Sequence, residues 1–327
     1  MRWTADHDHR PLRQNDDDCP IASGSGRRLA VGGQPSNQLR HTMTLIGILQ
    51  QPRIPESTAL GEELQRWLTE RGVASWTAAP WDDEPLAAPL DDTDLLIVLG
   101  GDGSTLRAAR WAVPHDVPIF GINVGRVGFL SEATPDDWPD KLARALNGEH
   151  WLERRLLLHA ELWRGGALVQ PFMALNEVVI GRGAQARVIR LHLRVDDDLV
   201  TTYIADALIV ATPTGSTAYA MAAGGPLLPP QLQNFVVVPV AAHLSLNRPL
   251  VLHENARIGI QVEMSHEAFL TADGQKSVAV ENGDEVLITK HQRPCLFARV
   301  ESPGFFYRRL MGRLGFSWPH LIPAPRP

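Results

Sequence analysis

The chain has 327 residues, of which 44% are apolar and 21% are charged, so it is long enough for about two domains and is not disordered throughout. Its formal net charge is −6 and its pI is near 6.1, a balance that argues against nucleic acid as its main partner. The sequence holds no run of about eighteen apolar residues, so we expect no membrane-spanning helix and no membrane partner.

Residues 1–42 differ from the rest of the chain because they show no sustained apolar period, and we expect them to form a disordered extension. They lack the apolar segment of a signal peptide. Two cysteines, Cys19 and Cys295, are too few for a disulfide framework, so we expect a reducing, cytoplasmic location. Met43 directly precedes the first apolar run, and we hypothesise that it is the true start of the protein.

Between residues 43 and 150 the pattern alternates between strand and helix. Apolar runs predict three strands, over 44–49, 94–99 and 118–123. Helices are predicted around them: one capped by Ser57 and ending at Gly72, one through Leu106, Ala109 and Trp111, and one that begins at Thr134 with Pro135 in its first position and ends near Gly148. This alternation predicts a small doubly wound α/β domain over residues 43–150.

After residue 151 the apolar period changes to two. Apolar and polar residues alternate over 189–195 and 258–264, which is typical of half-solvated antiparallel strands. Turn signals recur at 164–166, 196–198, 273–274 and 282–284. We therefore expect a β-rich, sandwich-like domain over residues 151–302. A terminal helix over 305–314, returning to the first domain, and a loose tail are expected within 303–327.

The first candidate site is the glycine loop that follows the predicted strand 94–99: Gly100, Gly101, Asp102, Gly103 and Ser104. Glycines allow a tight turn and close approach of the backbone to a ligand. A loop that enters a helix at the carboxyl end of a parallel strand directs N–H groups at a phosphate. Asp102 would then be a general base, a magnesium partner or an acceptor for a ribose hydroxyl. The alternative is an ordinary strand-to-helix turn.

Three further segments carry chemistry. The loop at 121–130, which includes Asn123, spaces its glycines as G-x-x-x-G-x-x-G, so it lacks the dinucleotide fingerprint and by itself favours a structural loop. Asn176 and Glu177 together can hold two hydroxyls of a ribose, or they form a polar strand edge. Thr-Pro-Thr-Gly-Ser-Thr-Ala-Tyr at 212–219 offers small side chains to a flat or phosphorylated ligand, or it starts a helix.

The order and spacing of these segments, together with Asp-Gly-Gln at 273–275, resemble NAD kinases, which phosphorylate the 2′-hydroxyl of the adenosine ribose of NAD to give NADP. The resemblance covers residues 44 to about 315. It implies that Asp102 is the general base and that the β-rich domain binds NAD. The resemblance also implies which residues bind the dinucleotide: Asp102, Gly103, Arg107, Asn123, Asn176, Glu177, Arg187, Asp206, Thr217, Ala218, Tyr219, Ala220, Met221, Ala222 and Gln275.

The same resemblance implies the partners. NAD is the acceptor, ATP or polyphosphate is the donor, and magnesium is carried with ATP rather than held by a metal site of the protein. A homo-oligomer, dimer or tetramer, is expected. The chain departs from the family at Ser104 and Thr105, where Thr and Leu are common, at Ile204, where Arg is frequent, and at Leu244, which interrupts a usual His-Ser-Leu.

Three other classes of protein compete with this interpretation. A lipid or sphingoid-base kinase shares the glycine loop but should lack the 212–219 block and Asn176-Glu177. A non-catalytic NAD(P)-binding regulator could dispense with Asp102. An NAD-dependent dehydrogenase is disfavoured because the fingerprint G-x-G-x-x-G is missing.

Overall fold

The computed structural model describes residues 43–79, 86–125, 128–185, 187–243, 246–304, 306–307 and 310–311. The extension expected over 1–42 lies outside the described residues, as do the tail and most of the terminal helix expected over 305–314. Of that helix, Leu310 is described and is buried. No helix among the described residues is long and apolar enough to cross a membrane.

The first sheet has the strand order β2-β1-β3-β4-β18-β5. Its strands are β1 (Leu45–Gln50), β2 (Ala74–Ala78), β3 (Leu95–Leu99), β4 (Ile119–Ile122), β5 (Trp151–Arg155) and β18 (Cys295–Arg299). The first four pair in parallel, β18 is parallel to β4, and β5 is antiparallel to β18. This mainly parallel sheet, with all of β3 buried, is what the apolar run at 94–99 predicts.

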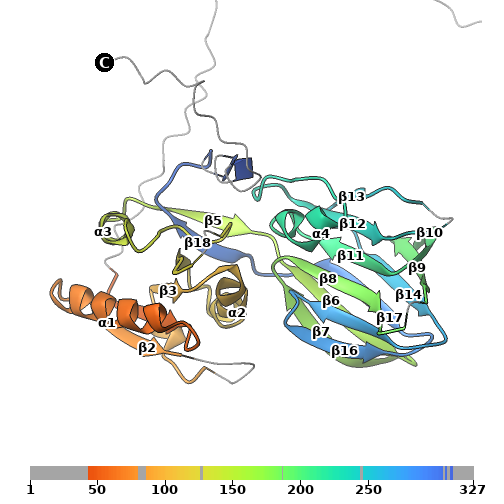
Figure 1. Ribbon diagram of the computed structural model, residues 1–327, viewed down its shortest axis with the longest axis horizontal. Helices are drawn as coiled ribbons and strands as arrows, with labels where there is room; N and C mark the ends of the chain where they lie inside the picture. The colour runs from red at the N-terminus through yellow and green to blue at the C-terminus, as the bar shows by residue number, and fades with distance from the viewer. Residues whose placement is uncertain are drawn as a thin grey trace, which may run out of the picture. The chain divides into compact units, whose positions relative to one another are not determined.

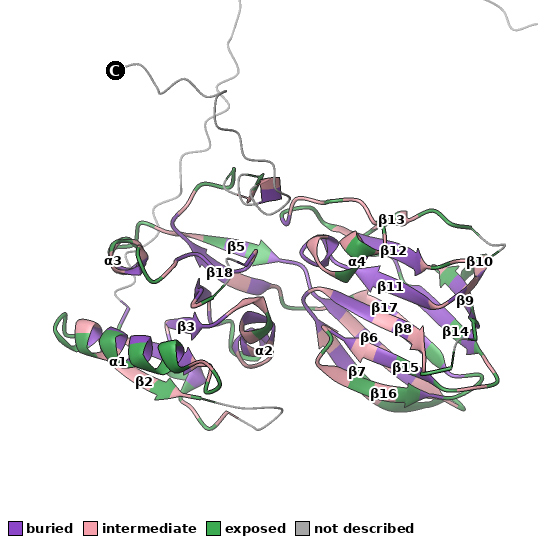
Figure 2. Ribbon diagram, viewed as in Figure 1, coloured by how far each residue is buried: buried purple, intermediate pink, exposed green. Residues whose placement is uncertain are grey.

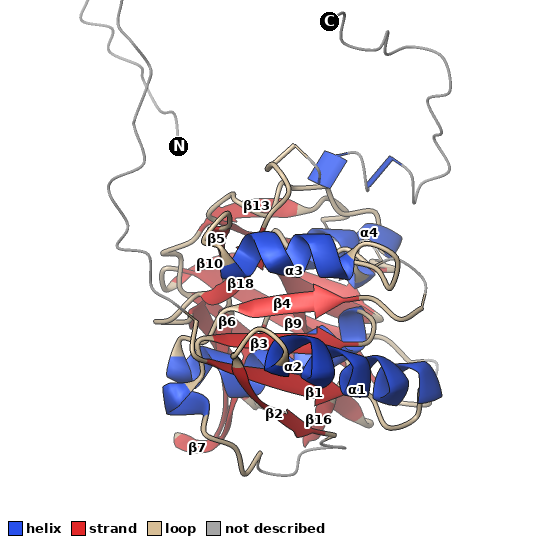
Figure 3. Ribbon diagram, turned by 90° about the vertical axis from the view of Figure 1, so that its left-hand side faces the viewer, coloured by secondary structure: helices blue, strands red, loops and turns tan. Residues whose placement is uncertain are grey.

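Helices cover both faces of this sheet. They are α1 (Pro55–Thr69), α2 (Asp102–Ala112) and α3 (Trp138–Leu146), with short 3-10 turns η1 (Leu90–Asp92) and η2 (Val113–His115). Leu95, Ile97 and Leu99 pack with α1 and α3, whereas Leu96 and Val98 pack with α2 on the other face. Figure 1 shows α2 between the sheet and the β-rich part, and Figure 3 shows α1 and α3 in front of the strands. The doubly wound arrangement is confirmed.

Two antiparallel sheets form the β-rich part. The second sheet has the order β10-β9-β14-β17-β6-β7 and the third has the order β13-β12-β11-β8-β15-β16. The strands are β6 (Leu158–Arg164), β7 (Ala167–Ala174), β8 (Glu177–Arg182), β9 (Ile189–Val195), β10 (Asp198–Ala205), β11 (Ala207–Ala211), β12 (Asn234–Val240), β13 (Leu250–His253), β14 (Ile258–Glu263), β15 (Ala268–Ala272), β16 (Lys276–Val280) and β17 (Glu285–Lys290). Between β11 and β12 lie the 3-10 turn η3 (Gly215–Thr217) and α4 (Tyr219–Ala222).

The inner faces of these two sheets share one apolar core, which confirms the sandwich. Leu191 of β9 and Leu208 of β11 belong to the same buried cluster. Along β9 the buried residues alternate with more exposed ones, as the period of two predicts. Figure 2 shows the buried residues running through both sheets.

Two predicted helix starts are wrong in detail. Ser57 lies inside α1, where its hydroxyl accepts the N–H of Gln51 at 2.7 Å and donates to the carbonyl of Leu99 at 3.1 Å. It therefore joins the ends of β1 and β3 instead of capping the helix. The third helix begins at Trp138 and not at Pro135, because Thr134 directs both its N–H and its hydroxyl to Asp137 Oδ1, at 2.6 and 3.0 Å, in a turn before the helix.

The first sheet takes strands from both sides of the boundary expected at residue 150, since β5 and β18 belong to it. We propose that the α/β part comprises residues 43–155 together with 295–300, and that the sandwich comprises 156–294. The four predicted turns are confirmed, and in them Gly165, Asp196, Asp273 and Gly283 adopt positive φ.

Candidate functional site

Only Gly100 and Gly101 separate β3 from α2, so the rest of the glycine loop forms the first turn of the helix. Gly101 precedes the helix, and its carbonyl accepts the N–H groups of Ser104 and Thr105 at 3.1 and 3.2 Å. A Cβ added at Gly101 or Gly103 would meet nothing within 4 Å, whereas one at Gly100 would lie 2.3 Å from Ser104 Oγ. The protein itself therefore does not fill the space beside Gly101 and Gly103. A phosphate can approach the backbone there, at the N-terminus of α2.

Asp102 is fixed by the second glycine loop. Its Oδ2 accepts the N–H of Phe129 at 2.9 Å, and its Oδ1 accepts the N–H of Leu130 at 3.0 Å. A Cβ at Gly128 would lie 1.9 Å from Asp102 Oδ1, so only glycine lets the carboxylate reach this position. The loop at 121–130 thus holds Asp102 in place, a role that its spacing did not suggest.

Asp273 connects three of the segments, and the sequence analysis treated it only as part of a turn. Its carboxylate accepts the N–H groups of Leu175, Asn176 and Glu177 at 2.9, 2.8 and 3.2 Å. In the same hairpin, Gln275 Nε2 donates to the carbonyl of Gly103 at 3.0 Å. Burial raises the pKa of Asp273, while the three N–H bonds oppose that rise. The hairpin between β15 and β16 therefore holds the start of β8 against the first turn of α2.

Glu177 has an unusual environment at the start of β8. Its side chain is 7% exposed, and its Oε2 has no hydrogen-bond partner among the described residues. Burial, followed by the negative charge of Asp273, raises the pKa of Glu177 to about 7, and the N–H of Tyr219, which donates to this carboxylate, opposes the rise. The half-buried side-chain amide of Asn176 makes no hydrogen bond within the described part of the chain. An amide and an unsatisfied carboxylate oxygen thus lie side by side in the chain.

The segment 212–219 packs against Asn176 and Glu177. Thr212 donates its hydroxyl to the carbonyl of Leu175 at 2.6 Å and its N–H to the carbonyl of Asn176 at 2.9 Å. A Cβ at Gly215 would lie 2.1 Å from the Asn176 oxygen, so the two backbones touch. With the Tyr219 bond to Glu177, these contacts bring the predicted segments around the glycine loop into one site.

Other residues expected at the dinucleotide occupy different places. Asp206 forms an ion pair with Arg182, with Nε 3.0 Å from Oδ1, and it precedes β11, whose far end pairs with Glu177. One strand length, about 16 Å, therefore separates Asp206 from Glu177. Arg187 is exposed, and its carbonyl accepts a bond from His266 Nε2 at 2.7 Å.

The remaining expected residues lie near the loop ends. Asn123 is buried beyond β4 and donates to the carbonyl of Gly125 at 3.1 Å. Arg107 and Ser104 line a small hollow beside the end of β1. In the 217–222 run Thr217, Ala218 and Met221 are half-buried, Tyr219 and Ala222 are exposed, and Ala220 is fully buried against β11 and β12.

Fold and site together define an α/β protein of the nucleotide-binding class whose glycine loop is held against a β-sandwich. Comparison with known families matches residues 81–150 to the ATP-NAD kinase N-terminal domain and residues 175–300 to the ATP-NAD kinase C-terminal domain. The NAD kinase of Chloroflexus aurantiacus is 41% identical over 269 residues, which are 82% of this chain and 98% of that protein. The NAD kinase of Geotalea daltonii is 37% identical over 278 residues, 81% of this chain and 96% of that protein.

Two solved structures are also similar. An NAD kinase from Archaeoglobus fulgidus in complex with ATP has a TM-score of 0.66 and 29% identity, and the match covers 84% of this chain and 100% of that one. The yeast NADH kinase complexed with NADH has the same fold, with a TM-score of 0.74 and 22% identity over 87% of this chain and 91% of that one. The chain belongs to the NAD kinase family, which confirms the resemblance and disfavours the three competing classes.

Proposed function

We propose that the protein is an NAD kinase, which transfers a phosphoryl group from ATP to the 2′-hydroxyl of the adenosine ribose of NAD and gives NADP. One observation carries the proposal: the Asp102 carboxylate is held by two backbone N–H groups beside Gly101 and Gly103, where the chain leaves space open at a helix N-terminus. Membership of the NAD kinase family supports NAD and ATP as the substrates that bind at this site.

In the proposed mechanism Asp102 is the general base. A ribose hydroxyl is a poor nucleophile until its proton is accepted in the transition state, and a placed base contributes typically ~10²- to 10⁴-fold. Asn176 and Glu177 bind the ribose, with the unsatisfied Glu177 Oε2 as one acceptor. The N–H groups at the start of α2 and the guanidinium of Arg107 stabilise charge on the donor phosphates.

The donor is ATP in this proposal, with polyphosphate as the alternative. Magnesium enters as part of the nucleotide substrate, because it usually binds phosphates with few protein ligands. Within the described ranges no group of three or more His, Cys, Asp and Glu side chains is placed to hold a metal ion. Asp206 and Arg187 would contact the more distant part of the dinucleotide. A homo-oligomer and a cytoplasmic location stay predictions.

An endpoint assay tests the function. The protein is incubated with NAD, magnesium and either ATP or polyphosphate, and NADP is measured with a dehydrogenase that accepts NADP only. The wild type should form NADP, and Asp102→Asn should lower turnover by about 10²- to 10⁴-fold while NAD still binds in calorimetry.

Asp284→Asn is the matched control for that assay. Asp284 also accepts a backbone N–H, from Glu281 at 2.8 Å, but it lies in a distant turn of the sandwich. Its variant should keep wild-type turnover. Near-normal turnover in Asp102→Asn would show that Asp102 is not the general base. If folded wild-type protein forms no NADP with either donor, the proposed function is wrong.

A further inference from the structure

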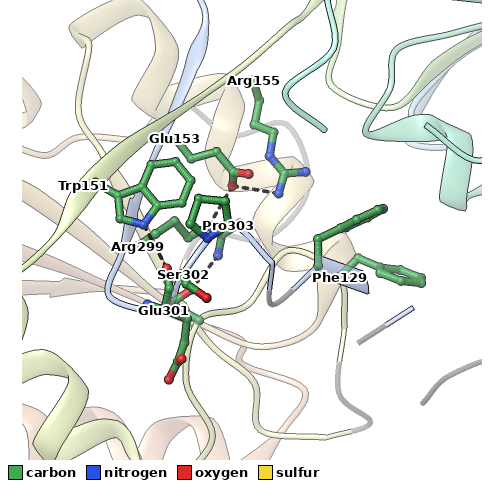
Figure 4. A pocket seen from close by; sticks show the side chains of 10 residues that line it. Phe129, Trp151, Glu153, Arg155, Arg299, Glu301, Ser302 and Pro303 are labelled. Carbon is green, nitrogen blue, oxygen red and sulfur yellow. Dashed lines mark hydrogen bonds and ion pairs between the residues drawn. The ribbon is translucent and has the colours of Figure 1, made fainter. Parts of the chain in front are cut away.

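Two glutamates and two arginines form a buried row in the first sheet and its neighbouring loop, here named the ion ladder: Glu132, Arg299, Glu153 and Arg155. These four residues are between 1% and 6% exposed. Arg299 joins the two glutamates, with Nη1 3.2 Å from Glu132 Oε2 and Nε 2.8 Å from Glu153 Oε2. The same oxygen of Glu153 accepts Arg155 Nη2 at 2.8 Å. Figure 4 shows Glu153 between the two arginines, beside a narrow cavity that Phe129 and Trp151 also line.

One end of the ion ladder reaches the loop that holds Asp102. Arg299 Nη1 donates to the carbonyl oxygens of Leu130 and Ser131, at 3.0 and 3.3 Å. Leu130 is one of the two residues whose N–H binds the Asp102 carboxylate. Glu132 lies two residues after Leu130, and its Oε1 accepts the N–H groups of Val300 and Glu301, which follow β18. Leu130 therefore binds the Asp102 carboxylate through its N–H while Arg299 holds its carbonyl oxygen.

The other end reaches the 212–219 segment. Arg155 Nη1 donates to the hydroxyl of Thr214 at 3.2 Å, and both groups are buried. The segment that follows Thr214 supplies Tyr219, whose N–H binds Glu177. Glu153 Oε1 accepts Gln231 Nε2 at 3.1 Å, which ties the chain beyond α4 to the ladder as well. The ion ladder thus links the loop whose N–H groups bind Asp102 to the 212–219 segment, which contacts Glu177 through Tyr219.

Stability alone does not explain this use of four charges. Replacing a buried ion pair with packed apolar residues is often neutral or stabilising, because taking charges out of water offsets their attraction. The guanidiniums of Arg299 and Arg155 lie over the Phe297 ring, at 4.7 and 5.4 Å from its centroid. Arg155 Nε has no hydrogen-bond partner among the described residues. Directional hydrogen bonds to two loops are what the charged groups supply and apolar side chains cannot.

We propose that the ion ladder is a positioning network that holds the Asp102 loop and the 212–219 segment in one fixed arrangement, so that Asp102 and Glu177 meet the same nucleotide. None of its four residues needs to touch substrate. The proposal rests on the proposed function, because it assigns Asp102 and Glu177 to one reaction. Its consequence is that loosening either end lowers kcat more than it weakens NAD binding.

At the Thr214 end, two variants isolate one hydrogen bond. Thr214→Val removes the hydroxyl at nearly constant volume, and Thr214→Ser keeps it. We expect Thr214→Val to lower kcat at least tenfold with the KM for NAD within twofold of wild type, and Thr214→Ser to restore kcat to within twofold. Equal kcat values in wild type and Thr214→Val would overturn the proposal, and so would equal losses in the two variants.

At the loop end, the variant is the charge-balanced pair Arg299→Met with Glu132→Gln. The amide oxygen of the new side chain still accepts the backbone N–H groups after β18, while the bonds to the loop carbonyls are lost. We expect kcat at least tenfold lower, with NAD binding by calorimetry within about threefold of wild type. The matched control is Arg164→Met with Asp284→Asn, another charge-balanced change at an ion pair, which links the end of β6 to the connection between β16 and β17; its kcat should stay at the wild-type value.

Combining the two ends tests the network itself. Residues that act as a unit are not additive, so Thr214→Val added to the charge-balanced pair should lower kcat little further. If the fold-losses of kcat in the separate variants multiply in the combined variant, the two ends act independently and the proposed network is wrong. If the charge-balanced pair fails to fold in thermal unfolding, the Thr214 variants decide alone. NADP formation by wild type in the same assay tests the proposed function separately, so an active wild type with unaffected variants removes only the positioning role.

Discussion

Glu177 is the residue whose chemistry depends most on its surroundings. An isolated glutamate is ionised at neutral pH, but burial and the neighbouring Asp273 raise the pKa of Glu177 to about 7. In its protonated form it donates one hydrogen bond, and in its ionised form it only accepts. Near neutral pH the same side chain can therefore serve a ribose hydroxyl in either sense, which a residue with an ordinary pKa cannot do.

This raised pKa predicts how stability depends on pH. Because the folded-state pKa lies above the unfolded one, the contribution of Glu177 to stability is full below about pH 4.5 and is lost as the pH rises through about 7. Glu177→Gln removes that loss. The variant should match wild type near pH 4 and exceed its free energy of unfolding by up to about 3 kcal/mol near pH 8, measured by urea unfolding.

The control for this experiment is Glu62→Gln on the exposed face of α1. Because Glu62 is exposed, this substitution should change the free energy of unfolding by no more than about 0.5 kcal/mol. A Glu177→Gln difference that stays constant from acid to alkaline pH would contradict the buried, raised-pKa description. NADP formation by Glu177→Gln should fall most above about pH 7, where the wild-type side chain is an ionised acceptor, and least at acidic pH, where it is protonated.

Gly128 gives a steric prediction at the same scale. An added methyl group would lie 1.9 Å from Asp102 Oδ1, so Gly128→Ala must displace the carboxylate or the loop. We expect its turnover to fall at least about 10²-fold, as for loss of the base itself. Gly125→Ala in the same loop meets nothing within 4 Å and serves as the control. Comparable turnover in the two variants would argue against a fixed Asp102.

At the scale of elements, α2 has a glycine in its first turn that the fold does not require. Gly103 sits in the first turn of the helix, and its Cβ position is open. Gly103→Ala should therefore raise the free energy of unfolding by about 0.5 kcal/mol, because alanine favours a helix more than glycine does. The same methyl group would occupy the space left for the phosphate, so ATP and NAD should bind more weakly in calorimetry. If Gly103→Ala is more stable but binds ATP and NAD as tightly as wild type, phosphate does not bind beside Gly103.

The elements also show what the sequence could predict. The strand 94–99, the glycine loop and Asp102 follow from local pattern, because an apolar run, a pair of glycines and a helix start are consecutive in the chain. Asp273 was missed as a binding partner because its contacts with residues 175–177 are about a hundred residues away. The pairing of Glu132 with Arg299 has the same cause. Ser57 has the chemistry of a cap, but its hydroxyl has better partners at the ends of β1 and β3.

On the scale of the whole molecule, the two parts are not independent along the chain. In β5 the charged Glu153 and Arg155 are buried and Leu152 is exposed, so no local pattern of apolar residues indicates this strand or the sheet that it joins. The chain crosses from the first sheet to the sandwich after β5 and returns only at β18. The ion ladder lies largely on these two strands, at the place where the chain enters and leaves the α/β part. The geometry of the site is therefore set by strands that close the first sheet.

This topology predicts the behaviour of fragments. Residues 43–150 contain the glycine loop and β1 to β4, but without β18 the strand β4 would become an edge with all four residues apolar or glycine. Such an edge exposes apolar surface and unpaired backbone groups, which favours aggregation over folding. The isolated fragment should show no cooperative unfolding in circular dichroism, whereas residues 43–327 should unfold cooperatively and form NADP. A fragment 43–150 that unfolds cooperatively would show that the α/β part does not depend on β5 and β18.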